Sequence, residues 1–143
     1  MALQHRDERF PDPVQRFHQP RARFDAAAIL AAQGIRCVMD ISDGLAGDAA
    51  HIARAAKVSI HLGPQAMAQH PDLQRFCDAY RLEPEATVLA GGEDYELLFA
   101  CRPEVFASIR PHLPEACQVG RIEPWTGEYL PGLPAHIRSF QHG

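Results

Sequence analysis

The spacing of apolar residues changes between helical and strand-like along most of the chain. An alanine-rich run at positions 26–33 favours a helix, with Asp25 as a good N-cap. From 35 to 41 apolar residues alternate, and the opposite face is also partly apolar, so the pattern predicts a strand in the interior of a sheet. Apolar residues then recur at helical spacing from 45 to 56, which predicts a helix directly after that strand.

The same alternation continues through the second half of the chain. It predicts a strand at 58–62, a helix from 71, a short apolar run at 86–90, a strand at 95–101, a helix from 103, a strand at 117–122 and a turn at 126–128 that can form a hairpin. This order indicates an α/β fold in which helices cover a mixed β-sheet. Residues 1–24 are rich in Arg, His, Gln and Pro without a sustained period, so we expect an extended arm or linker before one domain at 25–143.

Composition narrows the class of protein. The 143 residues carry a net charge of −4, so no basic surface favours nucleic acid or an anionic membrane. No apolar run is long enough to span a membrane and the N-terminus is charged, so we expect a cytoplasmic protein. The four cysteines are irregularly spaced without a CxxC motif, which favours buried structural thiols over zinc ligands or disulfides. The eight histidines form no metal-binding motif.

The candidate chemistry begins at Asp40-Ile41-Ser42-Asp43-Gly44, between the predicted strand at 35–41 and the next helix. Such a junction presents backbone N–H groups and side-chain oxygens to one small volume, where α/β proteins bind phosphates and metal ions. Asp40 and Asp43 would repel each other by roughly 3 kcal/mol at ~6 Å, and a divalent cation would convert that repulsion into binding. Alternatively, Asp43 or Ser42 only caps the helix and Asp40 is solvated. Asp48 is expected to be solvated or to pair with a neighbour on the helix face, and contact with the site is the less favoured alternative.

A second acidic turn follows about fifty residues later, at Gly91-Gly92-Glu93-Asp94, immediately before an apolar strand. Adjacent glycines allow close approach of the backbone or a positive φ. Two acid-bearing turns in one small domain suggest that both contribute to a shared site.

Together, the stretches Asp40–Leu45 and Gly91–Phe99 resemble the C-terminal domain of thiamine-monophosphate kinase. That family lies in the superfamily of aminoimidazole ribonucleotide synthetase and selenophosphate synthetase, and the likeness covers roughly residues 19 to 143. The resemblance implies a three-layer α/β (α+β) domain with a partial ferredoxin-like topology, like the C-terminal domain of aminoimidazole ribonucleotide synthetase. It also implies an ATP- and Mg²⁺-dependent transferase that phosphorylates thiamine monophosphate to thiamine diphosphate.

The resemblance further implies roles for individual residues, although it assigns no catalytic group because positioning and charge neutralisation suffice for phosphoryl transfer. By position in the motifs, the expected metal ligands are Asp40 and Asp43, the nucleotide contacts Ser42 and Gly44, and the substrate contacts Gly91, Gly92, Glu93, Asp94 and Phe140. Phe140 would stack on the thiamine ring system, or else only fix the C-terminal tail to the core, and Asp94 could instead only brace its turn.

Family members build their site between two domains, and the N-terminal domain has no counterpart in this chain. We therefore expect the isolated chain to be inactive or weakly active, and to need that N-terminal domain in cis or in trans as its partner. Two alternatives remain at this stage. The chain could be a free-standing relative that acts with a separate partner on another phosphorylated substrate, or a non-catalytic module that binds a small molecule.

Overall fold

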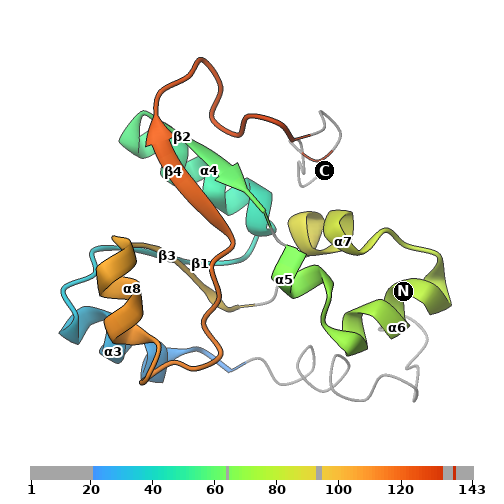
Figure 1. The fold of residues 1–143 in the computed structure, drawn as a ribbon, viewed down its shortest axis with the longest axis horizontal. Coiled ribbons are helices and arrows are strands. Elements are labelled where there is room, and N and C mark those ends of the chain that lie inside the picture. Colours follow the sequence, from blue (N-terminus) through green and yellow to red (C-terminus); the bar gives the residue numbers. More distant parts are fainter. Residues whose placement is uncertain (1–20, 64, 93–94, 134–136, 138–143) are drawn as a thin grey trace.

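The computed structural model describes residues 21–63, 65–92, 95–133 and 137 (Figure 1). The elements follow in the order α3 (Phe24–Ala32), β1 (Cys37–Asp40), α4 (Leu45–Ala56), β2 (Val58–Leu62), α5 (Gln65–Ala68), α6 (Pro71–Tyr80), α7 (Pro84–Ala90), β3 (Leu97–Ala100), α8 (Pro103–Ile109) and β4 (Gly120–Pro124). The helices α3 and α8 lie beside the β1–β3 pair, α4 packs on β2, and α5 to α7 form a separate helical group that contacts α4 through α7 (Figure 1).

The α/β class is confirmed, but the strands are arranged differently from the single mixed sheet that the sequence suggested. In the described residues they form two antiparallel pairs, β1 with β3 and β2 with β4. Cys37 lies opposite Ala100 in the first pair, and Val58 lies opposite Pro124 in the second. The spacing of apolar residues shows which face of a strand is covered, but it does not identify the neighbouring strand or its direction.

Several boundaries also differ from the expected ones. Helix α3 begins at Phe24, so Asp25 lies in its first turn and is not the N-cap. The apolar run at 86–90 belongs to helix α7, because Pro84 starts a helix there and the carboxylate of Glu83 accepts hydrogen bonds from two backbone N–H groups of its first turn. The turn at 126–128 does not join two strands of the described chain.

Two hydrophobic clusters hold these elements together. The larger one joins α4, β2 and α7, and its buried members include Leu45, Ala49 and Ala53 on one face of α4. The smaller one packs α3 against α8 through Leu30 and Ile109, both almost fully buried. Burial of an apolar side chain of this size stabilises the fold by about 1.5–3 kcal/mol. The start of α4 is therefore held by core packing, and the preceding bend is held with it.

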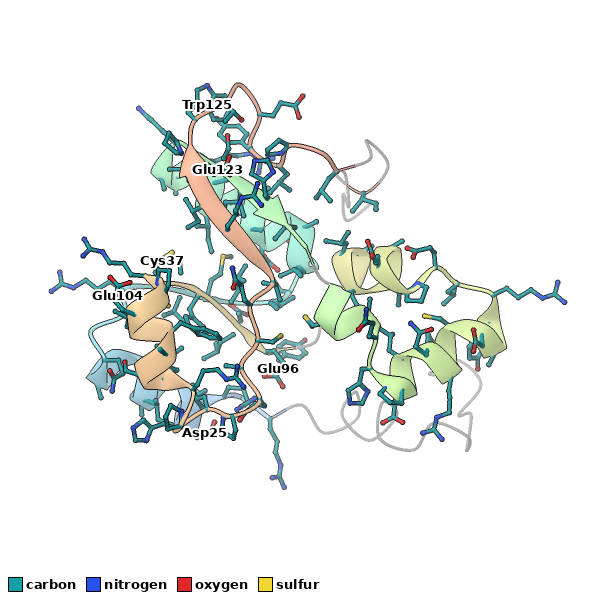
Figure 2. All side chains as sticks on the ribbon, in the orientation of Figure 1. Asp25, Cys37, Glu96, Glu104, Glu123 and Trp125 are labelled. Atoms are coloured by element: carbon teal, nitrogen blue, oxygen red, sulfur yellow. The ribbon has the colours of Figure 1, made fainter. Side chains whose placement is uncertain are left out.

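Arg23 connects three parts of the chain through carboxylates. Its guanidinium donates to Glu96 at 2.5 Å, to Glu115 at 2.6 Å and to Asp25 at 3.3 Å; Asp25 and Glu96 are labelled in Figure 2. The hydrogen bond to Glu115 raises the pKa of Arg23. Bonds from backbone N–H groups, together with the pairs to Arg23, lower the pKa of Asp25 and of Glu115. The network thus ties the start of α3 to the residue that precedes β3.

Ser59 makes a second connection, at the outer end of the β2–β4 pair. Its fully buried hydroxyl donates to the Glu128 carbonyl at 2.6 Å, lies 2.9 Å from the Thr126 hydroxyl, and accepts from the Thr126 N–H at 3.0 Å. These contacts hold the loop that follows β4. That loop also carries Trp125, labelled in Figure 2, whose ring packs against Tyr129 with centroids 4.7 Å apart.

All four cysteines are free, and two of them contradict the expectation of burial. Cys77 is buried in α6, whereas Cys101 and Cys117 are exposed. Partial burial nevertheless raises the pKa of both exposed thiols. Cys101 directly follows β3 and Cys117 lies between α8 and β4, where sequence does not show how far the covered region extends. No helix among the described residues is long and apolar enough to cross a membrane.

Candidate functional site

The first acidic bend lies between β1 and α4, as the sequence predicted. Asp40 is the exposed last residue of β1, and Ile41 beyond it is buried. Gly44 adopts φ +89°, which L side chains rarely adopt, and immediately precedes α4 without a side chain to cap it. The glycine therefore lets the chain reverse from strand to helix within four residues.

Asp48, one turn into α4, holds this bend from inside. Its side chain is 1% exposed, and its Oδ2 accepts hydrogen bonds from the backbone N–H groups of Ser42 at 2.9 Å and Asp43 at 3.1 Å. The expectation of a solvated Asp48 was therefore wrong. These two N–H groups already have a partner within the chain, although the strand-to-helix junction had suggested that they could face a phosphate. The available sequence signal resembles a capping box, in which an acid in the first turn reaches back to N–H groups before the helix.

The second bend packs directly on the first. Beyond the β1–β3 ladder, the Ile41 N–H donates to the Glu96 carbonyl at 2.8 Å, and the Tyr95 N–H donates to the Ile41 carbonyl at 3.2 Å. A Cβ atom added to Gly92 would lie 2.6 Å from the Ser42 carbonyl oxygen. A Cβ added to Gly44 would lie 3.1 Å from the Gly91 carbonyl oxygen. The absence of side chains at these glycines is what allows the two backbones to touch.

The structure thus brings together most of the residues proposed for the site. Ser42 and Asp43 are half-buried on the first bend, Gly44 is buried, and Gly91 and Gly92 lie against them. Asp40 is nearby in the chain, at the end of β1. The remaining candidates, Glu93, Asp94 and Phe140, lie outside the described residues.

One group of potential metal ligands occurs in the described part of the chain, at Asp43, Asp48 and His51, whose ligand atoms all lie within 4.8 Å of one another. The Asp43 Oδ2 is 3.8 Å from the His51 Nε2. Mg²⁺ prefers oxygen ligands and retains several waters, so the 37% exposed Asp43 carboxylate suits it, whereas an imidazole nitrogen does not. Asp40 is not a member of this group, and sequence reasoning did not identify His51, which lies one turn after Asp48 on α4.

The residues that follow the second bend are held in an unusual conformation. Tyr95 has φ +53°, the left-handed region, which costs a non-glycine residue about 1–2 kcal/mol. The side chain of its neighbour Glu96 accepts a hydrogen bond from Arg23, and the N–H of Tyr95 donates to the Ile41 carbonyl. Such a conformation persists where the surroundings enforce it, and it is frequent next to binding sites.

No family model matches the chain, but individual proteins do. A thiamine-monophosphate kinase of Aquifex aeolicus is 32% identical over 129 residues, which are 90% of this chain and 40% of that protein. A thiamine-monophosphate kinase of Mycobacterium tuberculosis is 38% identical over 95 residues, 66% of this chain and 28% of that protein. The crystal structure of the Aquifex aeolicus enzyme superimposes with a TM-score of 0.66 at 28% identity, over 87% of this chain and 42% of that one.

A second solved structure, AaThiL complexed with AMPPCP and TMP, superimposes with a TM-score of 0.72 at 30% identity over 90% of this chain. In sequence and in fold, the chain matches part of thiamine-monophosphate kinase. The family resemblance inferred from the two acidic motifs is confirmed, and so is a fold like that of aminoimidazole ribonucleotide synthetase. The chain spans 40% of the length of the Aquifex aeolicus relative and 28% of the Mycobacterium tuberculosis relative.

Proposed function

We propose that the chain contributes the Mg²⁺–ATP and substrate contacts of a thiamine-monophosphate kinase. The supporting observation is the contact between the two glycine-containing bends, where a Gly92 Cβ would lie 2.6 Å from the Ser42 carbonyl oxygen. Two acidic segments about fifty residues apart in sequence thereby share one location. The complex of AaThiL, which this chain matches over 41% of that protein, contains the ATP analogue AMPPCP together with TMP.

The proposed reaction transfers the γ-phosphoryl group of ATP to a phosphate oxygen of thiamine monophosphate. The bond from the γ-phosphorus to the bridging oxygen breaks, a new P–O bond forms, and ADP and thiamine diphosphate leave. Both reactants are anionic, so the protein has to align them and reduce their repulsion without supplying a nucleophile. Bound Mg²⁺ would supply this charge neutralisation.

The proposed contacts are those that the family resemblance implies for these residues. Asp40 and Asp43 would hold Mg²⁺, because carboxylate oxygens suit a hard cation and 37% of the Asp43 side chain is exposed. The hydroxyl of Ser42 and the backbone of Gly44 would contact the nucleotide. The remaining proposed residues, which would contact thiamine monophosphate, are Gly91, Gly92, Glu93, Asp94 and Phe140.

A direct test is the binding of AMPPCP to the chain by titration calorimetry, with and without Mg²⁺. We expect binding that requires Mg²⁺ and that the double variant Asp40→Asn, Asp43→Asn abolishes. Asp78→Asn is the matched control, because it removes a carboxylate from an exposed position on α6. Binding that is independent of Mg²⁺, or unchanged in the double variant, would refute the assigned metal role.

The second part of the proposal is a partner: the portion of a thiamine-monophosphate kinase that this chain does not match. We expect little or no thiamine diphosphate from the chain alone with ATP, Mg²⁺ and thiamine monophosphate. Addition in trans of the N-terminal portion of a relative should produce activity. If the mixture stays inactive although both parts bind ligand, the chain is better described as a binding module. The cytoplasmic location remains a prediction.

A further inference from the structure

Asp48 is the most deeply buried acidic side chain among the described residues, and the proposed reaction gives it no task. Its side chain is 1% exposed, in the first turns of α4. A carboxylate taken out of water is strongly unfavourable unless it is paired or hydrogen-bonded. Here the hydrogen-bond donors are two backbone N–H groups of the bend itself. The Ser42 nitrogen lies 2.9 Å and the Asp43 nitrogen 3.1 Å from the Asp48 Oδ2.

These two bonds fix the backbone of the bend. Each N–H belongs to a rigid peptide plane, so anchoring both to one oxygen fixes the orientation of two successive planes. The backbone conformation of Ser42 and Asp43 is then fixed. The opposite side of the bend is fixed as well, because Gly92 packs against the Ser42 carbonyl oxygen. The Asp43 carboxylate nevertheless keeps 37% of its surface exposed.

We propose that Asp48 is a positioning residue for the metal and nucleotide contacts of the acidic bend, an inference that rests on the function proposed above. Its carboxylate accepts hydrogen bonds from the N–H groups of Ser42 and Asp43, so these amides do not bind phosphate directly. Phosphate oxygens are then bound at the bend through the cation on Asp43 and through the Ser42 hydroxyl. Substitution of Asp48 therefore loosens the backbone that carries Asp43 but leaves the Asp43 carboxylate, the proposed metal ligand, in the chain.

A first experiment tests the hold on the bend without any ligand. Amide hydrogen exchange and amide proton shifts are measured by NMR for Asp48→Ala, Asp48→Asn and the control Asp78→Ala. In Asp48→Ala we expect exchange at Ser42 and Asp43 to rise at least about fivefold, with upfield amide shifts, because a hydrogen bond to a charged group is lost. Asp48→Asn retains one acceptor oxygen and is expected to show a smaller change in the same direction. Unchanged exchange and shifts at both amides would overturn the proposal.

A second experiment separates positioning from a purely structural role. The Mg²⁺ concentration that gives half-maximal AMPPCP binding is measured for the same variants, well below their unfolding temperatures. We expect a rise of about 10–100-fold in Asp48→Ala, as for other residues that orient metal ligands, with partial rescue in Asp48→Asn and no change in Asp78→Ala. Asp48→Asn alone carries the test if Asp48→Ala does not fold. A variant that melts at lower temperature but needs the same Mg²⁺ concentration would overturn the proposal.

The two measurements also distinguish this proposal from the proposed function. If the unaltered chain binds no AMPPCP with Mg²⁺, the proposed function fails, and amide exchange still decides whether Asp48 holds the bend. If the unaltered chain binds AMPPCP and both Asp48 variants bind it equally well, the proposed function stands and the positioning role is refuted.

Discussion

The contact between the two bends makes a specific prediction for Gly92→Ala. Gly92 does not have a positive φ, so alanine can adopt its backbone conformation. The added Cβ would lie 2.6 Å from the Ser42 carbonyl oxygen and 3.5 Å from the Gly44 nitrogen, and neither atom belongs to a flexible side chain. The substitution therefore tests the contact between the bends alone.

The expected loss of stability follows from how far the added Cβ and the Ser42 carbonyl oxygen must move apart. Ordinary contact begins at 3.4 Å, so the two backbones must separate by about 0.8 Å. Overpacking of this kind costs about 1–3 kcal/mol, and the lower entropy of the unfolded alanine chain returns about 0.4–1 kcal/mol. We expect a net loss of about 1–2 kcal/mol, which corresponds to a fall in Tm of about 3–10 °C for a chain of this size.

Urea unfolding followed by circular dichroism measures the loss, and Gly34→Ala is the matched control. Gly34 has φ +72°, and no atom lies within 4 Å of the position that an alanine methyl would take, so alanine there is strained but meets no neighbour. Both variants should lose stability, but only Gly92→Ala should shift the amide signals of Ser42 and Asp43 and weaken AMPPCP binding. If Gly92→Ala is as stable as the unaltered chain and leaves those signals in place, the two bends do not touch at this point.

Three further predictions concern other contacts. Arg23→Gln should destabilise the protein at low salt and less so at about 1 M salt, since two of the three lost pairs are exposed. A backbone hydrogen bond and Arg23 lower the pKa of Glu115 in the folded chain, so this stabilisation exists above its unfolded value of about 4.3 and disappears as pH falls. The urea midpoint should thus drop below about pH 4, and less steeply in Arg23→Gln. Ser59→Ala should cost about 1–3 kcal/mol in urea unfolding and alter the fluorescence of the single tryptophan. Burial raises the pKa of Cys101, so its alkylation, followed by mass spectrometry, should be slow at about pH 8 and faster at higher pH, while Cys77 should react only after unfolding.

Each of these expectations has an outcome that would contradict it. For Arg23→Gln, it is a stability loss that is the same at both salt concentrations, or an acid transition as steep as that of the unaltered chain. For Ser59→Ala, it is an unchanged unfolding midpoint together with an unchanged tryptophan spectrum. For the thiols, it is rapid labelling of Cys77 in the folded protein.

The position of the acidic bend could be predicted from the sequence because local signals agree there. A run of alternating apolar residues, two acids and a hydroxyl within four positions, a glycine and a helical pattern together predict the order strand, bend, helix at residues 37–56. The double glycine at 91–92 signalled a close approach of the backbone, and the structure places Gly92 against Ser42. Both signals depend on residue type and spacing over a few positions.

The position of Asp48 could not be predicted from the helical pattern. On a helical projection Asp48 shares the side of His51 and Arg54, which are exposed, so the pattern gives it a solvated place. The first turn of a helix is different, because N–H groups at and before its start need acceptors and can draw an acid inward. The pairing of the strands could not be predicted for a different reason. Strand β1 pairs with β3, which is distant in the sequence, and local patterns carry no signal of that partner.

The backbone of the acidic bend is held by its surroundings. Three contacts act on it: the Asp48 carboxylate on two N–H groups, the second bend on the Ser42 carbonyl, and the backbone bonds of Ile41 to Tyr95 and Glu96. None of them uses the exposed part of the Asp43 carboxylate. A ligand that binds there meets a backbone already ordered by folding, so little further ordering is needed on binding. Under the proposed function, the chain would therefore contribute an ordered backbone to the site, and the proposed partner portion would complete the coordination of the ligand.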